Sequence, residues 1–412
     1  MPDPKMSDDE LVGLTRGYLT QRRATRPAPG LEDDILAFAL TRRRSKHLGT
    51  VFGVIAVVVV SALTAVGVLY LHAGSSGWHV AEDSSGADVY AVSCVNSGDC
   101  WAVGSAIEHE SSASGWSVVS DRLPAGGSLN GVACASGDMC WAVGAVNDGN
   151  HSQLLIEHGV GGEWAVVRAP AMSTNPGTFP ELSSVTCVSA NDCWAVGSAA
   201  TEGGPAVQPL IAHYAGSRWS VVDSPRIGGS GGELTAVTCV TSDDCWAVGP
   251  NSLIEHYLGG GWVVEASQGV QGTLSAVTCI AADSCWAVGS TGAGDTEQPL
   301  VERYSTAGWA VVPSPHISVP NGGELEGVAC VSPNECWAVG DLPGIGALLP
   351  QTLPNTADSE PSTQPLIERY SGGEWAIVAG TSSKQGGVLT SIACDSSGAC
   401  WAVGGTLRES TS

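Results

Sequence analysis

Cysteine is the first residue type in this chain whose spacing points to chemistry. All fourteen cysteines lie after residue 93, and they form seven pairs in which five residues separate the two thiols. A zinc site needs about four ligands, whereas each isolated pair supplies two. We therefore expect disulfides rather than metal sites. The pairs are Cys94 and Cys100, Cys134 and Cys140, Cys187 and Cys193, Cys239 and Cys245, Cys279 and Cys285, Cys330 and Cys336, and Cys394 and Cys400.

Each pair is expected to lie in a β-hairpin. If Val95 and Asp99 face each other across the loop Asn96-Ser97-Gly98, Cys94 and Cys100 become directly opposed residues of two antiparallel strands. Opposed residues in a non-hydrogen-bonded pair have Cα atoms about 4.5 Å apart, a separation that a disulfide accepts. Such cross-links would stiffen individual hairpins and would not join neighbouring repeats.

Acidic or amide side chains precede many of the second cysteines. Asp and Asn are favoured in turns because their side chains hydrogen-bond to the nearby backbone. A calcium site would need several oxygen ligands converging in one loop, and each of these turns offers one or two. We therefore expect turn residues here, and neither a metal nor a cofactor. The residues are Asp99, Asn191, Asp192, Asp243, Asp244 and Asp283.

A second repeated pattern places Glu directly before His or Arg. Glu and His are the usual partners in acid-base catalysis, so the pattern invites a catalytic interpretation. Adjacent residues of a strand point to opposite faces of the sheet, however. We therefore expect cross-strand ion pairs and solvated faces, and assign no catalytic residue. The pairs are Glu108-His109, Glu157-His158, Glu255-His256, Glu302-Arg303 and Glu368-Arg369.

These residues belong to a unit that occurs seven times and is centred on the sequence Cys-Trp-Ala-Val-Gly. The most compact copy predicts strands at residues 234–239, 245–249, 252–257 and 262–265. Four short antiparallel strands in each of seven copies predict an all-β fold, a seven-bladed β-propeller. On the second strand, Trp and Val point one way and Cys, Ala and Gly the other, so each Trp is expected to bury against the neighbouring blade.

The two ends of the repeat region complement each other. The last copy has a first strand that ends at Cys394, a second at residues 400–404 and a third at residues 406–409, and it lacks a fourth. A strand of the fourth type, around Trp78, precedes every cysteine. We expect this N-terminal strand to complete the last blade, which closes the ring and leaves no open edge.

The residues before the repeats predict a membrane anchor. Residues 48–71 contain no charged residue, and twenty-four residues in a helix span about 36 Å, enough to cross a bilayer. The basic cluster at residues 42–46, against an acidic region beyond the helix, places the N-terminus in the cytoplasm. We expect a short helical cytoplasmic arm (1–47), a transmembrane signal anchor (48–72) and an extracellular propeller (73–412). The arm is either a solvated segment or a docking element for an intracellular regulator.

Charge and cysteine content restrict the partners and the compartment. The formal net charge is −24, and residues 1–47 hold nine of the 17 Lys and Arg residues, so the repeat region is more acidic still. An acidic domain repels phosphate backbones, so nucleic acid is not expected as a partner. All cysteines follow the predicted anchor, which indicates an oxidising compartment on that side of the membrane.

The sequence Trp-Ala-Val-Gly, followed by a strand, a Gly-rich turn and a second Trp, as in residues 337–340 and 372–375, resembles the repeats of BNR or Asp-box propellers. That group includes sialidase-like domains and photosystem II assembly-factor propellers, and the resemblance extends over residues 77–410. It implies the fold and not glycosidase activity, because sialidases need an arginine triad that has no recognisable motif here. At the Asp-box aspartate this chain instead has Tyr214, Tyr257, Tyr304 and Tyr370.

The connections that vary most in length join strands two and three of a blade, or one blade to the next. In a propeller both sets emerge on one face, and loops on a rigid scaffold commonly carry recognition. The longest, at residues 341–363, is a docking segment or a disordered loop. We expect a binding, sensing or scaffold module of the cell membrane, whose extracellular propeller recognises a protein or glycan of the cell envelope, and not an enzyme.

The alternative is a sialidase-like envelope glycoside hydrolase or lyase. Catalysis would need at least two carboxylates, or a His and a carboxylate, that converge at the variable face with shifted pKa values. The variable connections contain scattered acids and histidines without an arginine cluster, which favours binding. These residues are Glu202, Glu233, Asp295, Glu297, Glu324, His151 and His316.

Overall fold

The computed structural model describes residues 78–80, 86–111, 115–120, 122–147, 151–170, 172, 178–201, 207–225, 232–267, 271–318, 322–343, 363–378, 387–405 and 407–411. The chain divides into two units, Met1–Gly74 and Ser75–Ser412. The predicted cytoplasmic arm and membrane anchor lie outside the described residues. Within those residues, no helix is long and apolar enough to cross a membrane.

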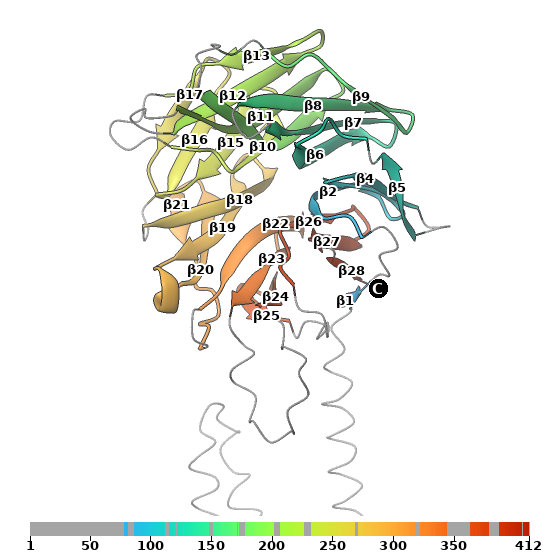
Figure 1. Cartoon of the computed structure of the whole chain (residues 1–412). Coiled ribbons are helices and arrows are strands. Elements are labelled where there is room, and N and C mark those ends of the chain that lie inside the picture. The colour runs from blue at the N-terminus through green and yellow to red at the C-terminus, as the bar shows by residue number, and fades with distance from the viewer. Residues whose placement is uncertain are drawn as a thin grey trace, which may run out of the picture. The chain divides into compact units, whose positions relative to one another are not determined.

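The described strands of the second unit form seven antiparallel four-stranded sheets arranged as a ring, which confirms the seven-bladed propeller (Figure 1). We number the sheets as blades 1 to 7 in chain order. Blade 1 contains β2 (Val89–Asn96), β3 (Asp99–Gly104), β4 (Ile107–Ser111) and β5 (Gly115–Ser120). Blade 2 contains β6 (Gly127–Ser136), β7 (Met139–Asn147), β8 (Ser152–Val160) and β9 (Glu163–Val166). Blade 3 contains β10 (Thr178–Ser189), β11 (Asp192–Thr201), β12 (Gln208–Ala215) and β13 (Trp219–Val222).

Blade 4 contains β14 (Ala236–Thr241), β15 (Asp244–Gly249), β16 (Leu253–Tyr257) and β17 (Trp262–Glu265). Blade 5 contains β18 (Gly272–Ala281), β19 (Ser284–Thr291), β20 (Gln298–Ser305) and β21 (Gly308–Val311). Blade 6 contains β22 (Glu324–Ser332), β23 (Glu335–Pro343), β24 (Thr363–Ser371) and β25 (Glu374–Ile377). Blade 7 contains β26 (Ser391–Cys394), β27 (Cys400–Gly404), β28 (Leu407–Thr411) and β1 (Trp78–Val80). A single-turn 3-10 helix, η1 (Gly294–Thr296), lies between β19 and β20.

The N-terminal strand closes the ring, as the sequence predicts. β1 pairs antiparallel with β28, with Trp78 opposite Thr411 and Val80 opposite Glu409. The sheet order β1-β28-β27-β26 makes the N-terminal strand the outermost strand of the blade formed by the C-terminus. Closure therefore depends on two segments from opposite ends of the propeller sequence.

Adjacent blades pack a large face against a small one. Trp194 and Val196 of β11 contact Val237, Cys245 and Ala247 of the following blade, and all five side chains are at most 6% exposed. The same arrangement occurs at the other blade interfaces. The predicted packing role of the repeated Trp is therefore confirmed.

All seven cysteine pairs form disulfides between directly opposed residues, with Cα atoms 4.0 to 4.1 Å apart. The predicted three-residue loop is wrong in detail, however. Asn96 pairs with Asp99 across a two-residue turn, and a β-bulge shifts the register between Cys94 and Asn96. The bulge supplies the extra residue that five intervening positions require, so the cysteines stay opposed.

The glycine that ends each repeated sequence has a steric function. A Cβ atom on Gly249 would lie 2.1 Å from the carbonyl oxygen of Glu233 on the neighbouring first strand. In the other six copies the same distance is 2.0 or 2.1 Å. Only glycine lets the first strand approach the second this closely, which explains why this position is Gly in every copy.

Two predicted boundaries change. The first strand of blade 4 is Ala236–Thr241, two residues later than predicted, and Thr241 pairs with Asp244. The long insert is shorter than residues 341–363, because Asp341 pairs with Pro365 and Pro343 with Thr363 as parts of β23 and β24. Strand pairing therefore extends into the predicted loop from both sides, and residues 344–362 lie outside the described part of the chain.

Candidate functional site

The two ends of the ring present different surfaces. Because the strands are antiparallel, the starts of the first strands and the connections between second and third strands lie at one end, which we call the variable face. The disulfide hairpin turns lie at the other end, the turn face. First strands of successive blades contact one another, so they surround the ring axis. These innermost strands are β2, β6, β10, β14, β18, β22 and β26.

Four innermost segments carry a carboxylate at the same position of the variable face. At this position the backbone carbonyl oxygen lies 2.0 or 2.1 Å from the point that a Cβ atom would occupy on the glycine that ends the repeated sequence. Its occupants, here named the mouth carboxylates, are Asp88, Glu181, Glu233 and Glu324. The first three are exposed and Glu324 is half-buried, so negative charge surrounds the ring axis at this end.

Glu324 belongs to a compact group with Glu297, Glu326 and Asp341. Glu324 and Asp341 are directly opposed in the ladder between β22 and β23. Burial raises the pKa of Glu324 to about 6, helped by the charges of Asp341 and Glu297 and by a hydrogen bond that the Glu324 carboxyl donates to Asp341. Asp341 is 5% exposed, and burial raises its pKa too. Two neighbouring carboxyl groups at the variable face thus share a proton.

Glu326 occupies a bulge position that recurs on the innermost strands. In three other blades this position holds a donor to a carbonyl oxygen of the next blade: Asn130 Nδ2 to Leu182 (3.0 Å), Thr235 Oγ1 to Leu274 (2.7 Å), and Thr390 Oγ1 to Tyr90 (2.8 Å). Burial, with the charges of Glu324, Asp341 and Glu297, raises the pKa of Glu326 to about 7. Glu326 therefore takes up a proton at a higher pH than an exposed glutamate does, at a position where three other blades carry a neutral donor.

The sequence predicted scattered acids at this face, and the structure brings two of them, Glu297 and Glu324, together with Glu326 and Asp341. The signal for Asp341 was its place directly after the repeated glycine, opposite Glu324 once the hairpin register is known. Glu233 is exposed at the same face, and His151 and His316 are exposed in the connections that open there. Glu202 and the side chain of Asp295 lie outside the described part.

The glutamates of the Glu-His and Glu-Arg pairs are buried, which contradicts the prediction of solvated faces. Glu108, Glu255, Glu302 and Glu368 are 0% exposed and Glu157 is 4% exposed. Each is opposite the Ala of the repeated sequence, so it lies on the face that packs against the preceding blade. The missed signal was this register, which puts Glu on the same side as the buried Ala.

Serines from the preceding blade bind three of these glutamates. Ser224 Oγ donates to Glu255 (2.9 Å), Ser267 Oγ to Glu302 (2.6 Å) and Ser314 Oγ to both carboxylate oxygens of Glu368 (3.0 and 2.9 Å). Burial, only partly offset by the serine hydrogen bonds, raises the pKa of Glu255 and of Glu368 to about 7. These glutamates therefore form polar bridges with serines across the blade interfaces and do not face a substrate.

The His and Arg side chains of these pairs lie on the opposite sheet face, where they meet acids across the strand pair. His109 and His256 donate to Asp99 and Asp244 at 2.9 and 2.8 Å, and His213, at the same position of blade 3, donates to Asp192 at 2.7 Å. Arg369 forms the predicted cross-strand ion pair, with Glu335. Three of the acids assigned to turns thus also accept a hydrogen bond from a histidine.

Each of these His and Arg side chains also lies over the repeated Trp. His256 stacks on Trp246 with ring centroids 3.6 Å apart, and Arg303 and Arg369 lie 5.0 Å from the ring centroids of Trp286 and Trp337. In blade 2, Met139 replaces the acid, and burial lowers the pKa of His158. In six blades the repeated Trp therefore carries a His or Arg side chain, and in four of them an acid lies beside it.

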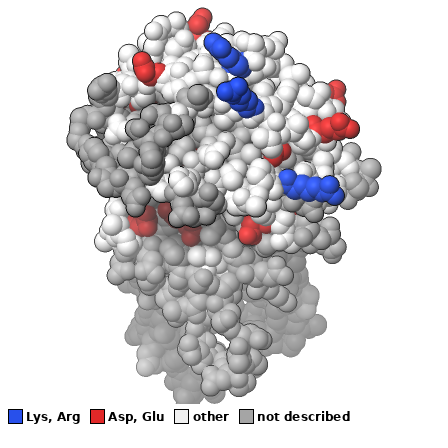
Figure 2. Space-filling model, turned by 45° about the horizontal axis from the view of Figure 1, so that its top comes forward, with Lys and Arg blue, Asp and Glu red and all other residues white. Residues whose placement is uncertain are grey.

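Figure 2 shows one face of the molecule, on which a few charged side chains lie within a largely uncharged surface. Among the described residues, no three His, Cys, Asp or Glu side chains are arranged to hold a metal ion. The mouth carboxylates and the acid group beside them are acids that the strand register gathers at the variable face.

Comparisons with known proteins establish the fold. No protein-family model and no curated protein sequence matches the chain. Solved structures do: YCF48 bound to a D1 peptide has 13% identity and a TM-score of 0.52, over 82% of this chain and 95% of that one. The WD40 propeller domain of Doa1 has 11% identity and a TM-score of 0.53, over 81% and 97%. A streptogramin B lyase has 13% identity and a TM-score of 0.56, over 81% and 96%. The chain is therefore similar in fold, and in fold alone, to β-propellers that include peptide-bound proteins and an enzyme.

Proposed function

We propose that this propeller is a binding module that recognises a protein partner, or a glycan, of the cell envelope through its variable face. The observation that carries the proposal is the recurrence of a carboxylate at one position on four innermost segments, at the face into which the variable connections open. Asp88, Glu181 and Glu233 are exposed, and Glu324 is half-buried and lies opposite the buried Asp341. Such a surface complements a basic segment of a partner protein.

The fold supports a binding role by analogy. A structure of similar fold, YCF48, holds a D1 peptide. We extend the proposal to kinship with the BNR or Asp-box propellers, and to a single-pass membrane anchor at residues 48–72 with the propeller outside the cell. The seven disulfides support an oxidising compartment. Protease treatment of intact cells, which should degrade the propeller and spare residues 1–47, tests this topology.

The test of the binding face compares two triple variants of the full-length chain. One carries Asp88→Asn, Glu181→Gln and Glu233→Gln. The control carries Asp243→Asn, Asp283→Asn and Glu374→Gln, which remove the same charge from exposed positions at the turn face. Quantitative cross-linking in cells should lose the main partner in the first variant and keep it in the control. Equal recovery from both variants contradicts the proposed face.

A second candidate function rests on the proton-sharing pair of Glu324 and Asp341. Paired carboxyl groups with separated roles are the basis of glycoside hydrolysis, so this pair favours a hydrolase or lyase over other enzyme classes. We infer binding rather than catalysis because an arginine triad is not seen among the described side chains near the pair. Turnover of a glycan panel that is abolished in both Glu324→Gln and Asp341→Asn variants would establish the enzyme.

A further inference from the structure

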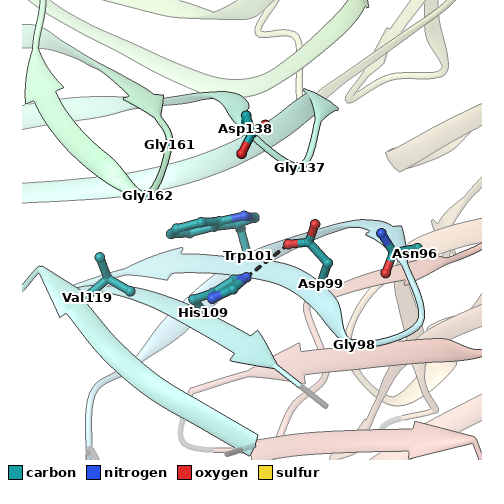
Figure 3. A pocket seen from close by; sticks show the side chains of 10 residues that line it. All are labelled: Asn96, Gly98, Asp99, Trp101, His109, Val119, Gly137, Asp138, Gly161 and Gly162. Atoms are coloured by element: carbon teal, nitrogen blue, oxygen red, sulfur yellow. Dashed lines mark hydrogen bonds and ion pairs between the residues drawn. The ribbon is translucent and has the colours of Figure 1, made fainter. Parts of the chain in front are cut away.

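A cleft of about 620 Å³ opens between blades 1 and 2 at the turn face (Figure 3). Its floor is formed by Trp101, His109 and Val119 of blade 1. Asp99 belongs to the hairpin turn of blade 1 and Asp138 to that of blade 2. Four glycines of the adjoining turns expose backbone at its edges. The cleft thus lies at the opposite end of the ring from the mouth carboxylates.

The interface of blades 1 and 2 lacks a tyrosine that other interfaces have. At four other blade interfaces a third-strand Tyr lies against the Trp of the preceding blade, with ring centroids 4.5 to 4.7 Å apart. In blade 2 the register places Gly159 at this position, opposite Cys140 and Trp164. Trp164 is left partly exposed, whereas its six counterparts are at most 6% exposed.

The charge of the cleft fits a cation. Asp99 lies beside the edges of the stacked rings of Trp101 and His109, whose centroids are 4.3 Å apart, and Asp138 lies beyond the Trp101 ring, on the side away from His109 (Figure 3). His109 Nε2 donates to Asp99 Oδ1 at 2.9 Å, while Asp138 is exposed. None of the residues that line the cleft is Lys or Arg. The site therefore offers a planar aromatic floor with an uncompensated carboxylate.

Two other blades show which cation such a platform accepts. The guanidinium of Arg303 lies over Trp286 and donates to the Tyr370 hydroxyl of the next blade at 3.5 Å. The guanidinium of Arg369 lies over Trp337 and pairs with Glu335. At the interface of blades 1 and 2 the shorter His109 replaces Arg, and Gly159 of blade 2 replaces Tyr. The Trp164 ring lies over Gly159 and takes up part of the space that Tyr fills elsewhere.

We propose that the cleft between blades 1 and 2 binds an arginine side chain of a partner protein. The planar guanidinium lies against His109, which is stacked on the buried Trp101, and donates to Asp138 and to the free oxygen of Asp99. Its aliphatic stem packs on Val119. Arginine fits better than lysine because a guanidinium both stacks on aromatic rings and donates to two carboxylates.

The test uses saturation-transfer NMR to measure the binding of four probes to the full-length protein. The probes are the N-acetyl amides of arginine, lysine, tyrosine and leucine. The arginine amide should bind with a dissociation constant on the order of 1 mM, as expected for one side chain. The Gly159→Tyr variant should lose the signal, because Tyr fills the cleft. Asp138→Asn should weaken binding roughly threefold to fivefold. Asp283→Asn, at the same turn position of blade 5, should have no effect.

The folding of the Gly159→Tyr variant is checked by its melting temperature. A Cβ at residue 159 would lie 2.7 Å from the Trp164 ring, but Tyr214 and Trp219 coexist at the equivalent positions of blade 3, so Trp164 can move aside. Equal arginine binding by wild type and both cleft variants would overturn the proposal. A lysine, tyrosine or leucine amide that binds as well as arginine amide would overturn the assignment to a guanidinium.

Discussion

The indole of Trp78 packs edge-on against that of Trp337, with ring centroids 5.4 Å apart and an interplanar angle of 77°. Trp78 is 1% exposed although its strand contains three residues. At the interface of blades 3 and 4, Trp262 and Trp194 meet in the same way, at 5.5 Å and 78°. The N-terminal strand therefore makes the contact with blade 6 that a fourth strand makes elsewhere.

Loss of this contact should open the ring. We expect Trp78→Ala to lower the free energy of unfolding by about 3 to 5 kcal/mol, since the substitution leaves a large cavity beside Trp337. Urea unfolding followed by tryptophan fluorescence measures the loss. His79→Ala, an exposed position on the same strand, is the control and should cost less than about 0.5 kcal/mol. Similar values for the two variants would mean that the strand does not close the ring in solution.

The buried glutamates predict a stability that falls as pH rises. Burial raises the pKa of Glu255 and of Glu368 to about 7 in the folded protein, above the ordinary glutamate value of 4.5, so the folded state holds protons that the unfolded state releases. The contribution of these two glutamates to the free energy of unfolding is therefore fully present below about pH 4.5 and is lost as the pH rises through about 7. Each such glutamate contributes at most about 1.4 kcal/mol per pH unit in that window.

Unfolding in urea at pH 5, 6, 7 and 8 measures this dependence. The variants Glu255→Gln and Glu368→Gln should each flatten the curve, because glutamine does not ionise. Glu374→Gln, at an exposed position, should leave the slope unchanged. A stability that is constant or rises between pH 5 and pH 8 in the wild-type protein would contradict ionisation of these carboxyl groups.

Replacing both the serine and the glutamate of one bridge should cost less stability than the two single replacements added together. In blade 3 the glutamate position is Ala212, and the serine position of the preceding connection is Ala169; both belong to one apolar cluster. We expect Ser224→Ala alone to cost about 1 to 3 kcal/mol, because it removes the donor to a buried carboxyl. Together with Glu255→Ala it should cost clearly less than the sum of the single changes. A double-mutant cycle by urea unfolding measures the coupling, and strict additivity would argue against it.

The disulfides should stabilise hairpins locally. Replacing both Cys239 and Cys245 by Ala should lower the unfolding free energy by about 2 kcal/mol, the chain-entropy value for so short a loop. The dependence of that free energy on urea should stay unchanged, because the ring remains closed by β1. A change in this slope would indicate that the cross-link holds more than its own hairpin.

The sequence alone determined the blade count, the disulfide partners and the ring closure. Each depends on spacing within one repeat, such as five residues between Cys94 and Cys100, or on counting strands at the two ends. Strand alternation then fixes which side chains share a face, so the burial of Trp246 and Ala247 against neighbouring blades was predictable too.

Only the tertiary structure decided what lies across each blade interface. The bridge between Ser224 and Glu255, the grouping of Glu297 with Glu324, and the cleft opened by Gly159 each depend on how one copy meets the next. The repeats are nearly identical in their own register, so their local patterns do not reveal where a neighbour supplies Ser, Tyr or Gly. The side-chain contacts that could carry chemistry in this protein therefore depend on the residues that differ between copies, and these residues meet only when the ring closes.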